Sequence, residues 1–170
     1  KKQVNILVAT DVAARELGAD DRKLAEALAL SHLVCGYIKA YTGRLTPTCG
    51  CAVAAGAGAA AGIVRLHGGT PRQAELAAIT LVGTLLGMIC DGAKPGCALK
   101  IATAVSAAQR AAVLALSLEH TVQPYGIVSS DVEATIQNLG TLGRDGMGNA
   151  NDVVLRMMLD GQHDENVLRL

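Results

Sequence analysis

Four cysteines are the residues whose type and placement could do chemistry in this chain. Cys49 and Cys51 flank a single glycine just after Pro47, and Cys90 and Cys97 enclose a loop rich in glycine and proline. The surrounding apolar periodicity predicts that all four lie at helix boundaries. A thiol at a helix N-terminus loses its proton more easily, and the thiolate is the form that binds metals. We therefore expect a site for iron–sulfur or other metal chemistry.

The spacing of these cysteines does not select one metal. One residue separates Cys49 from Cys51 and six separate Cys90 from Cys97. Structural zinc sites commonly have two to four residues within each pair, and ferredoxins place three cysteines in a short stretch. The fifth cysteine, Cys35, lies among apolar helical neighbours and fits a small buried hydrophobe. From spacing alone, zinc, a cluster and plain packing at helix junctions all stay open.

The elements that must position these thiols are all predicted to be helices. Apolar periodicity and cap signals predict helices over residues 4–17, 21–41, 51–66, 71–89, 97–119, 131–139 and 150–161. Capping boxes are expected at Thr70–Gln73, with Pro71 in the first turn, and at Ser130–Glu133. No useful stretch alternates like a strand. The prediction is an all-α fold: one compact domain of closely packed Ala/Gly-rich helices over residues 1–161, then a polar tail, 162–170.

Glycines in the third predicted helix imitate a dinucleotide-binding fingerprint. Gly56, Gly58 and Gly62 have a suggestive spacing, but that fingerprint requires a preceding strand, which the sequence does not predict. The chain contains no Phe and no Trp, so its core must form by close approach of helix backbones. We interpret these glycines as helix-packing positions.

Composition argues against several classes of partner. The 15 basic and 15 acidic residues cancel, so no net field attracts nucleic acid. An odd number of cysteines does not resemble a secreted disulfide framework and favours reduced thiols in the cytoplasm. The apolar stretches 51–64 and 98–118 are too short or carry Lys100 and Arg110, so we expect no membrane span.

Three segments of the chain resemble a known enzyme family. They are TGRLTPTCGCAVAAG (42–56), GMICDGAKPGCALKIATAV (87–105) and NLGTLGRDGM (138–147). Together they resemble the L-cysteine desulfidase family, which is related to the iron–sulfur L-serine dehydratase alpha chain. The similarity covers nearly the whole chain, and its most specific motif is the Cys-Asp-Gly-Ala-Lys run at 90–94.

The resemblance implies a lyase that uses a [4Fe–4S] cluster held by three cysteine thiolates, with one iron open to the substrate. Its substrate would be a small amino acid: L-cysteine would lose sulfide, or L-serine would lose water, and pyruvate and ammonia would form. By motif, the cluster ligands would be Cys90, Cys49 and Cys97, with Cys51 as the alternative to Cys49. A homo-oligomer is compatible with the resemblance.

The catalytic groups are less defined than the ligands. Lys94, Lys100 and Asp91 flank the cysteines and are candidates for binding the substrate carboxylate, orienting the cluster or moving the proton. Arg44 is a further carboxylate-binding candidate on charge and position. For each of them, an ordinary exposed surface residue remains an equal alternative.

The resemblance also implies that an upstream part of the enzyme is not included in this chain. Family members are considerably longer and have upstream motifs, including an early cysteine, and this chain opens without Met inside a helical pattern. We expect the C-terminal catalytic part of a longer enzyme, with an active site that is incomplete without its N-terminal part. The alternative from another class is a non-catalytic helical interaction domain with structural cysteines.

Overall fold

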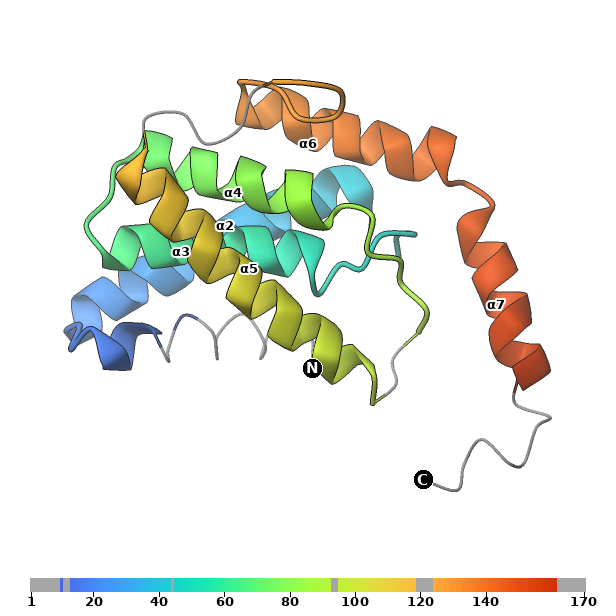
Figure 1. Cartoon of the computed structure of the whole chain (residues 1–170), viewed down its shortest axis with the longest axis horizontal. Helices are drawn as coiled ribbons and strands as arrows, with labels where there is room; N and C mark the ends of the chain where they lie inside the picture. Colours follow the sequence, from blue (N-terminus) through green and yellow to red (C-terminus); the bar gives the residue numbers. More distant parts are fainter. Residues whose placement is uncertain (1–9, 11–12, 44, 93–94, 119–123, 162–170) are drawn as a thin grey trace.

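The computed structural model describes residues 10, 13–43, 45–92, 95–118 and 124–161, and that part of the chain is built from helices (Figure 1). They are α2 (Asp21–Thr42), α3 (Val53–Leu66), α4 (Pro71–Leu85), α5 (Cys97–Ser117), α6 (Val132–Thr141), the π-helix η1 (Leu142–Gly146) and α7 (Ala150–Gly161). The extended pairing found among these residues is limited to two isolated bridges. The predicted all-α class is confirmed.

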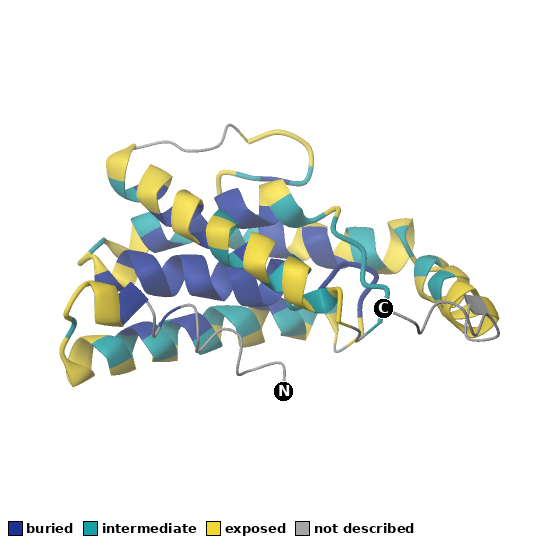
Figure 2. Ribbon diagram, turned by 60° about the horizontal axis from the view of Figure 1, so that its bottom comes forward, coloured by how far each residue is buried: buried dark blue, intermediate teal, exposed yellow. Residues whose placement is uncertain are grey.

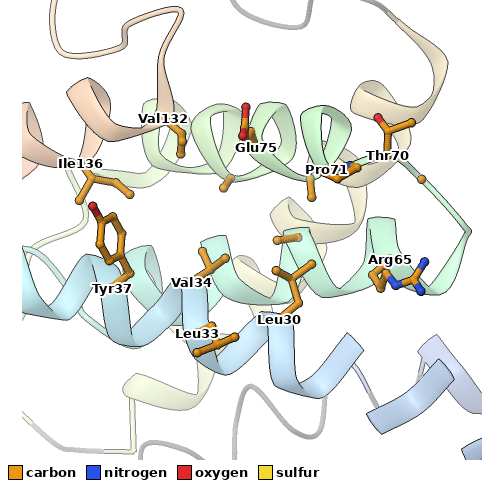
Figure 3. A pocket seen from close by; sticks show the side chains of 14 residues that line it. Leu30, Leu33, Val34, Tyr37, Arg65, Thr70, Pro71, Glu75, Val132 and Ile136 are labelled. Atoms are coloured by element: carbon orange, nitrogen blue, oxygen red, sulfur yellow. The ribbon is translucent and has the colours of Figure 1, made fainter. Parts of the chain in front are cut away.

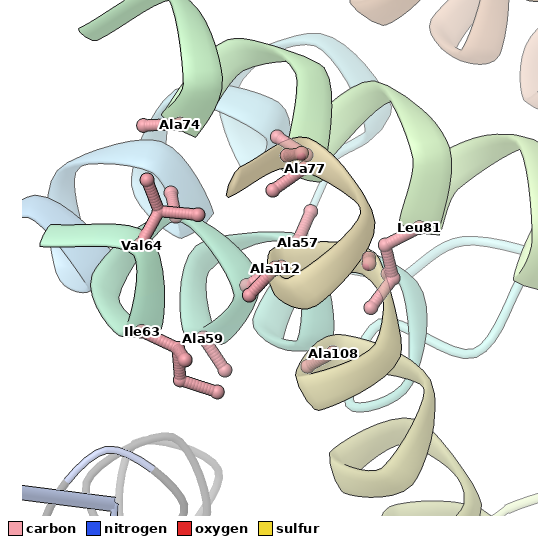
Figure 4. Packing of buried hydrophobic residues seen from close by; sticks show 14 of the residues in the cluster. Ala57, Ala59, Ile63, Val64, Ala74, Ala77, Leu81, Ala108 and Ala112 are labelled. Carbon is pink, nitrogen blue, oxygen red and sulfur yellow. The ribbon is translucent and has the colours of Figure 1, made fainter. Parts of the chain in front are cut away.

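Helix α3 forms the centre of the domain. Every residue in it except Arg65 is buried, and it packs against α2, α4 and α5. Figure 2 shows this helix enclosed, while the outer faces of its neighbours are exposed. Alanines such as Ala57, Ala108 and Ala112 fill the core between α3 and α5, with Leu81 from α4 (Figure 4). Small side chains let the helix axes approach closely, and this replaces packing by Phe and Trp rings, which the chain lacks.

The glycines of α3 are packing positions, as predicted. A Cβ at Gly58 would fall on the backbone carbonyl oxygen of Ser31 in α2, and one at Gly62 would lie 2.9 Å from that of Ala27. A Cβ at Gly56 would meet the methyl groups of Leu81, on a different face, at 3.1 Å. The absence of side chains therefore lets α2 and α3 cross in backbone contact.

The capping predictions are correct for one helix and displaced for another. Thr70 and Gln73 make the complete capping box at the start of α4. In α6, Asp131 rather than Ser130 is the N-cap, accepting from the Ala134 N–H. The second capping box is therefore wrong, because Glu133 accepts bonds from tyrosines of α2 and does not reach back to the helix start.

Two predicted helix ends are also wrong. Helix α4 ends at Leu85, before the predicted residue 89, because the following segment pairs with the chain near Thr48. Helix α6 does not stop at Gly140 but continues to Thr141 and into η1. Gly140 instead lies against α2, where a Cβ would be 2.9 Å from the Tyr41 carbonyl oxygen.

The structure describes the two ends of the chain only in part. Residues 13–16 of the predicted first helix are helical, and Gly18 follows with φ +60°. The rest of that helix and the tail at 162–170 lie outside the described residues. Helix α7 carries exposed apolar side chains such as Leu155 and Met157.

Helix α5 is long and apolar enough by composition to cross a membrane, alone among the helices described, and 28% of its apolar window is buried. It packs on α3 and α4, and one such helix is also typical of a protein core. The absence of a membrane partner stays a prediction.

Candidate thiol site

The segments that carry Cys49 and Cys90 lie side by side. Thr48 and Ile89 form an isolated antiparallel bridge. The Cys49 N–H donates to the Met88 carbonyl at 2.6 Å, and the Cys90 N–H donates to the Pro47 carbonyl at 2.8 Å. Residues about 40 positions apart in the sequence are thereby joined by backbone hydrogen bonds. Cys90 consequently lies in extended chain beyond α4, and its predicted position at the end of that helix is wrong.

This bridge also determines the face from which the two thiols project. Side chains alternate in extended chain, and each cysteine follows a bridge residue by one position. By this alternation we expect Cys49 and Cys90 to be diagonal neighbours on the face opposite Thr48 and Ile89. Cys49 is buried at 4% exposure, whereas Cys90 is half-buried. None of the five cysteines, all of which lie in the described residues, is joined in a disulfide.

Cys97 begins α5, as predicted, and its thiol donates to the Gly92 carbonyl at 3.0 Å. The N-terminus of α5 has no side-chain cap and no acidic residue in its first turn. Gly92 has φ +92°, a conformation that favours glycine. Met158 of α7 lies directly against Gly92, so the last helix contacts the loop between Cys90 and Cys97.

Lys100 connects this loop to α5. Its ammonium donates to the Ile89 carbonyl at 2.8 Å and forms a salt bridge with the Asp91 carboxylate. The bond to Asp91 raises the pKa of Lys100 against the opposing effect of desolvation, and the thiols of Cys49 and Cys97 contribute in the same direction. Of the predicted catalytic residues, Lys100 and Asp91 thus lie together beside the cysteines. Lys94 and Arg44 lie outside the described residues.

A second lysine lies at the Cys49–Cys51 turn and was not predicted. A Cβ on Gly50 would be 2.5 Å from Nζ of Lys39 and 3.1 Å from its Cε. Lys39 extends from α2, one helical turn after Cys35. Burial raises the pKa of the Cys35 thiol, the Lys39 charge lowers it and Cys51 raises it. Cys35 and Lys39 are four residues apart on one helix, and this spacing could have indicated that the lysine lies near a thiol.

The π-helix η1 lies against the segment that leads to Cys49. Thr46 and Thr48 share a hydroxyl–hydroxyl bond of 3.1 Å, and a Cβ on Gly143 would be 3.7 Å from the Thr46 hydroxyl. Arg144 donates to the Tyr41 carbonyl at the end of α2 at 3.1 Å. Single-turn π-helices are frequent at functional sites. The third motif of the resemblance therefore packs against the first.

The thiols fit an iron–sulfur cluster in kind. Soft thiolates are the donors that such clusters and zinc take, and two of the three predicted ligands project from paired segments. In the described part of the chain, however, no three His, Cys, Asp or Glu side chains stand close enough to hold a metal ion. A ligating thiolate cannot donate a hydrogen bond, so Cys97 would have to give up its bond to Gly92.

The most apolar groove found lies elsewhere on the molecule. It has a volume of about 540 Å³ and runs between α2, α4 and α6 (Figure 3). Leu30, Leu33 and Tyr37 form one wall, and Arg65 and Glu75 provide charge at its margin. No cysteine lines this groove.

Known proteins match most of the chain, including both segments that carry the cysteines. The profile of the family described as "Serine dehydratase alpha chain" matches residues 5–156. A "UPF0597 protein" of Nitratidesulfovibrio vulgaris (strain DP4) is 50% identical over 160 residues, which cover 94% of this chain and 36% of the relative. A "UPF0597 protein" of Clostridioides difficile is 51% identical over 140 residues, or 82% of this chain and 33% of the relative. The chain thus spans about a third of the length of these curated relatives. No solved structure matches significantly.

Proposed function

The chain belongs to the serine dehydratase alpha-chain family, and on this premise we propose that it supplies the cysteine ligands of an iron–sulfur lyase acting on a small amino acid. The proposed cofactor is a [4Fe–4S] cluster, and the proposed reaction is release of sulfide from L-cysteine. The alternative within the same chemistry is release of water from L-serine.

One observation carries this proposal: the backbone bridge that joins the Cys49 turn to the Cys90 segment. Plain packing of cysteines at helix junctions would not require two distant thiols to project from the same face of paired chains. The proposed ligands are Cys49, Cys90 and Cys97. Cys51 stays the alternative to Cys49, although it is Cys49 whose backbone N–H bonds to the segment that carries Cys90.

When bound, the cluster would supply a Lewis-acidic iron for the substrate. In the proposed reaction L-cysteine loses its α-proton. The electron pair left on the α-carbon forms a double bond to the β-carbon, and the bond from the β-carbon to sulfur breaks. Sulfide departs, and water hydrolyses the resulting aminoacrylate to pyruvate and ammonia.

Lys100 is protonated at neutral pH because its pKa is raised. It therefore suits holding the loop through Asp91 and the Ile89 carbonyl better than accepting a proton. The base remains unassigned, and Lys94 stays a candidate on its position in the motif.

The proposal is tested by anaerobic reconstitution of this chain with iron and sulfide. We expect broad visible absorption that is lost in Cys90→Ser and Cys49→Ser. Cys35→Ser is the matched control, because Cys35 is a half-buried free thiol outside the proposed ligand set, and it should retain the absorption. A wild-type chain that stays colourless would refute a cluster held by Cys49, Cys90 and Cys97 alone, and absorption that survives Cys90→Ser would refute Cys90 as a ligand.

The substrate is tested by measuring sulfide and pyruvate after supplying L-cysteine or L-serine to the reconstituted protein. Sulfide and pyruvate in equal amounts from L-cysteine would support the desulfidase activity. Pyruvate from L-serine alone, with L-cysteine acting only as an inhibitor, would support the dehydratase alternative instead.

A further inference from the structure

We propose that the apolar groove between α2, α4 and α6 receives helix α7 of a second copy of this chain, so that two copies form a symmetric dimer in which each α7 lies in the other's groove. This dimer goes beyond the proposed function and does not depend on it, because no cysteine lines the groove and no step of the proposed reaction uses α7. Its basis is that one chain carries both an apolar helix and an apolar groove, each of which the other described residues leave largely exposed.

Helix α7 has a broad apolar face. Its charged residues, Asp152, Arg156 and Asp160, follow one another at intervals of four and therefore form one narrow stripe along the helix. Most of the remaining circumference is apolar. Five apolar side chains of the helix are each at least 38% exposed: Val153, Leu155, Met157, Met158 and Leu159. A helix that is apolar around most of its circumference is normally buried, yet in Figure 1 α7 extends away from the helices that form the core.

The groove presents a mostly apolar surface, and the charged groups at its margin are already paired. Side chains of α2, α4 and α6 line it (Figure 3). At its margin, Arg65 forms a salt bridge with Glu26. Glu75 forms another with Arg72. A charged ligand would have to compete with one of these ion pairs, whereas an apolar helix face would not, and a hydrophobic groove is a common receptor for such a face.

Tyr37 gives the groove an aromatic side chain that is already held in place. Its hydroxyl donates to the Glu133 carboxylate, which also accepts from Tyr41 at 2.6 Å. Tyr37 nevertheless stays exposed and lines the groove. A ring that is fixed before association loses little conformational freedom when it is covered, and tyrosine is one of the residues that contribute most to protein interfaces. The groove is therefore preformed to receive a protein surface.

The dimensions of the helix and the groove agree. The lining extends on α2 from Leu30 to Tyr37 and on α4 from Pro71 to Ala78, which is about 10 Å along each wall. The apolar stretch of α7, from Val153 to Leu159, covers the same two turns. A two-turn helix face and the groove that it covers bury about 500 Å² together, and two symmetric contacts bury about 1,000 Å². Only the second value reaches the size of a specific interface, which favours reciprocal insertion and a weak dimer.

The test is the mass of the metal-free chain in solution, measured by sedimentation equilibrium over a range of protein concentrations. We expect the average mass to rise with concentration from that of one chain to that of two. Leu33→Glu places a charge in the groove. The double variant Leu155→Lys/Met157→Lys places charges on both sides of Met158, which contacts Gly92 of the same chain. Either change should raise the dissociation constant of the dimer about tenfold or more.

These variants should fold, because the three side chains are exposed within one chain, and far-UV circular dichroism checks that they do. Val113→Glu is the matched control, since Val113 is an exposed apolar residue of α5 outside the groove, and it should leave the dimer unchanged. An equal mixture of Leu33→Glu and the α7 double variant should dimerise more tightly than either alone. In that mixed dimer the native α7 of one chain meets the native groove of the other.

A wild-type chain that stays monomeric at every concentration would overturn the proposal and leave the groove to the part of the relatives that lies outside this chain. A dimer that survives either variant, that Val113→Glu weakens equally, or that the mixture does not restore would also overturn it. The wild-type measurement needs no variant to fold. Because iron and substrate are absent, the dimer can be found even if cluster reconstitution fails, and it can be refuted even if reconstitution succeeds.

Discussion

The backbone contact between α2 and α3 leads to a quantitative prediction for the stability of two Gly→Ala variants. Gly58 and Gly36 both lie inside helices, and alanine is favoured over glycine there by about 0.5–1 kcal/mol. At Gly36 a Cβ would meet nothing within 4 Å, so Gly36→Ala should gain that amount. At Gly58 the new methyl would fall on the Ser31 carbonyl oxygen, and backbone cannot move aside as a flexible side chain can.

Overpacking of a close contact costs about 1–3 kcal/mol, so Gly58→Ala should lose about 1–2 kcal/mol net. For a chain of this length, 1 kcal/mol corresponds to a shift in Tm of about 2–4 °C. We expect the Tm of Gly58→Ala to fall by about 2–8 °C and that of Gly36→Ala to rise by about 1–4 °C. Gly56→Ala should lie between them, because its methyl would press only on the Leu81 side chain.

The assay is thermal unfolding followed by circular dichroism at 222 nm, with all variants in the same buffer. The result that would refute the reasoning is a Gly58→Ala variant as stable as Gly36→Ala. Equal stability would mean that α2 and α3 do not cross in backbone contact at this position.

Three further predictions concern single side chains. Hydrogen bonds from Tyr37 and Tyr41 lower the pKa of Glu133 below its usual 4.5. The stability that the Glu133 carboxylate contributes is therefore present above pH 4.5 and is lost as the pH falls through the lowered pKa. Urea midpoints between about pH 3 and 6 should show this loss in the wild type but not in Glu133→Gln. Thr70→Ala removes the cap of α4 and should cost about 1 kcal/mol, measured as a lower urea midpoint. The Ser31 hydroxyl is buried without a hydrogen-bond partner among the described residues, so Ser31→Ala should be neutral or stabilising in the same measurement, and a loss above about 1 kcal/mol would contradict that.

The local features of this protein could be derived from the sequence, because they depend on neighbouring residues. The capping box at Thr70 and the start of α5 at Cys97 follow from short-range chemistry. The exclusion of strands and the packing role of Gly58 follow from periodicity and from the absence of Phe and Trp.

Pairings between distant segments could not be derived in this way. The bridge at Thr48 and Ile89 ends α4 four residues early, and no local signal announces it, because the competing hydrogen bonds come from a segment 40 residues away. In the same way, Gly140 reads as a helix stop but is a contact with α2, and its φ is not positive.

For the cysteines, some features could be derived from the sequence and others depend on the tertiary structure. Their residue type and their predicted positions at helix boundaries were sufficient to identify them as candidates, although Cys90 lies in extended chain beyond α4, and thiol chemistry limits what they could bind. Which thiols share a face, and which charges accompany them, was decided by the tertiary structure. Lys39 of α2 lies against Gly50, just before α3, and this proximity depends on how the two helices pack rather than on any sequence motif.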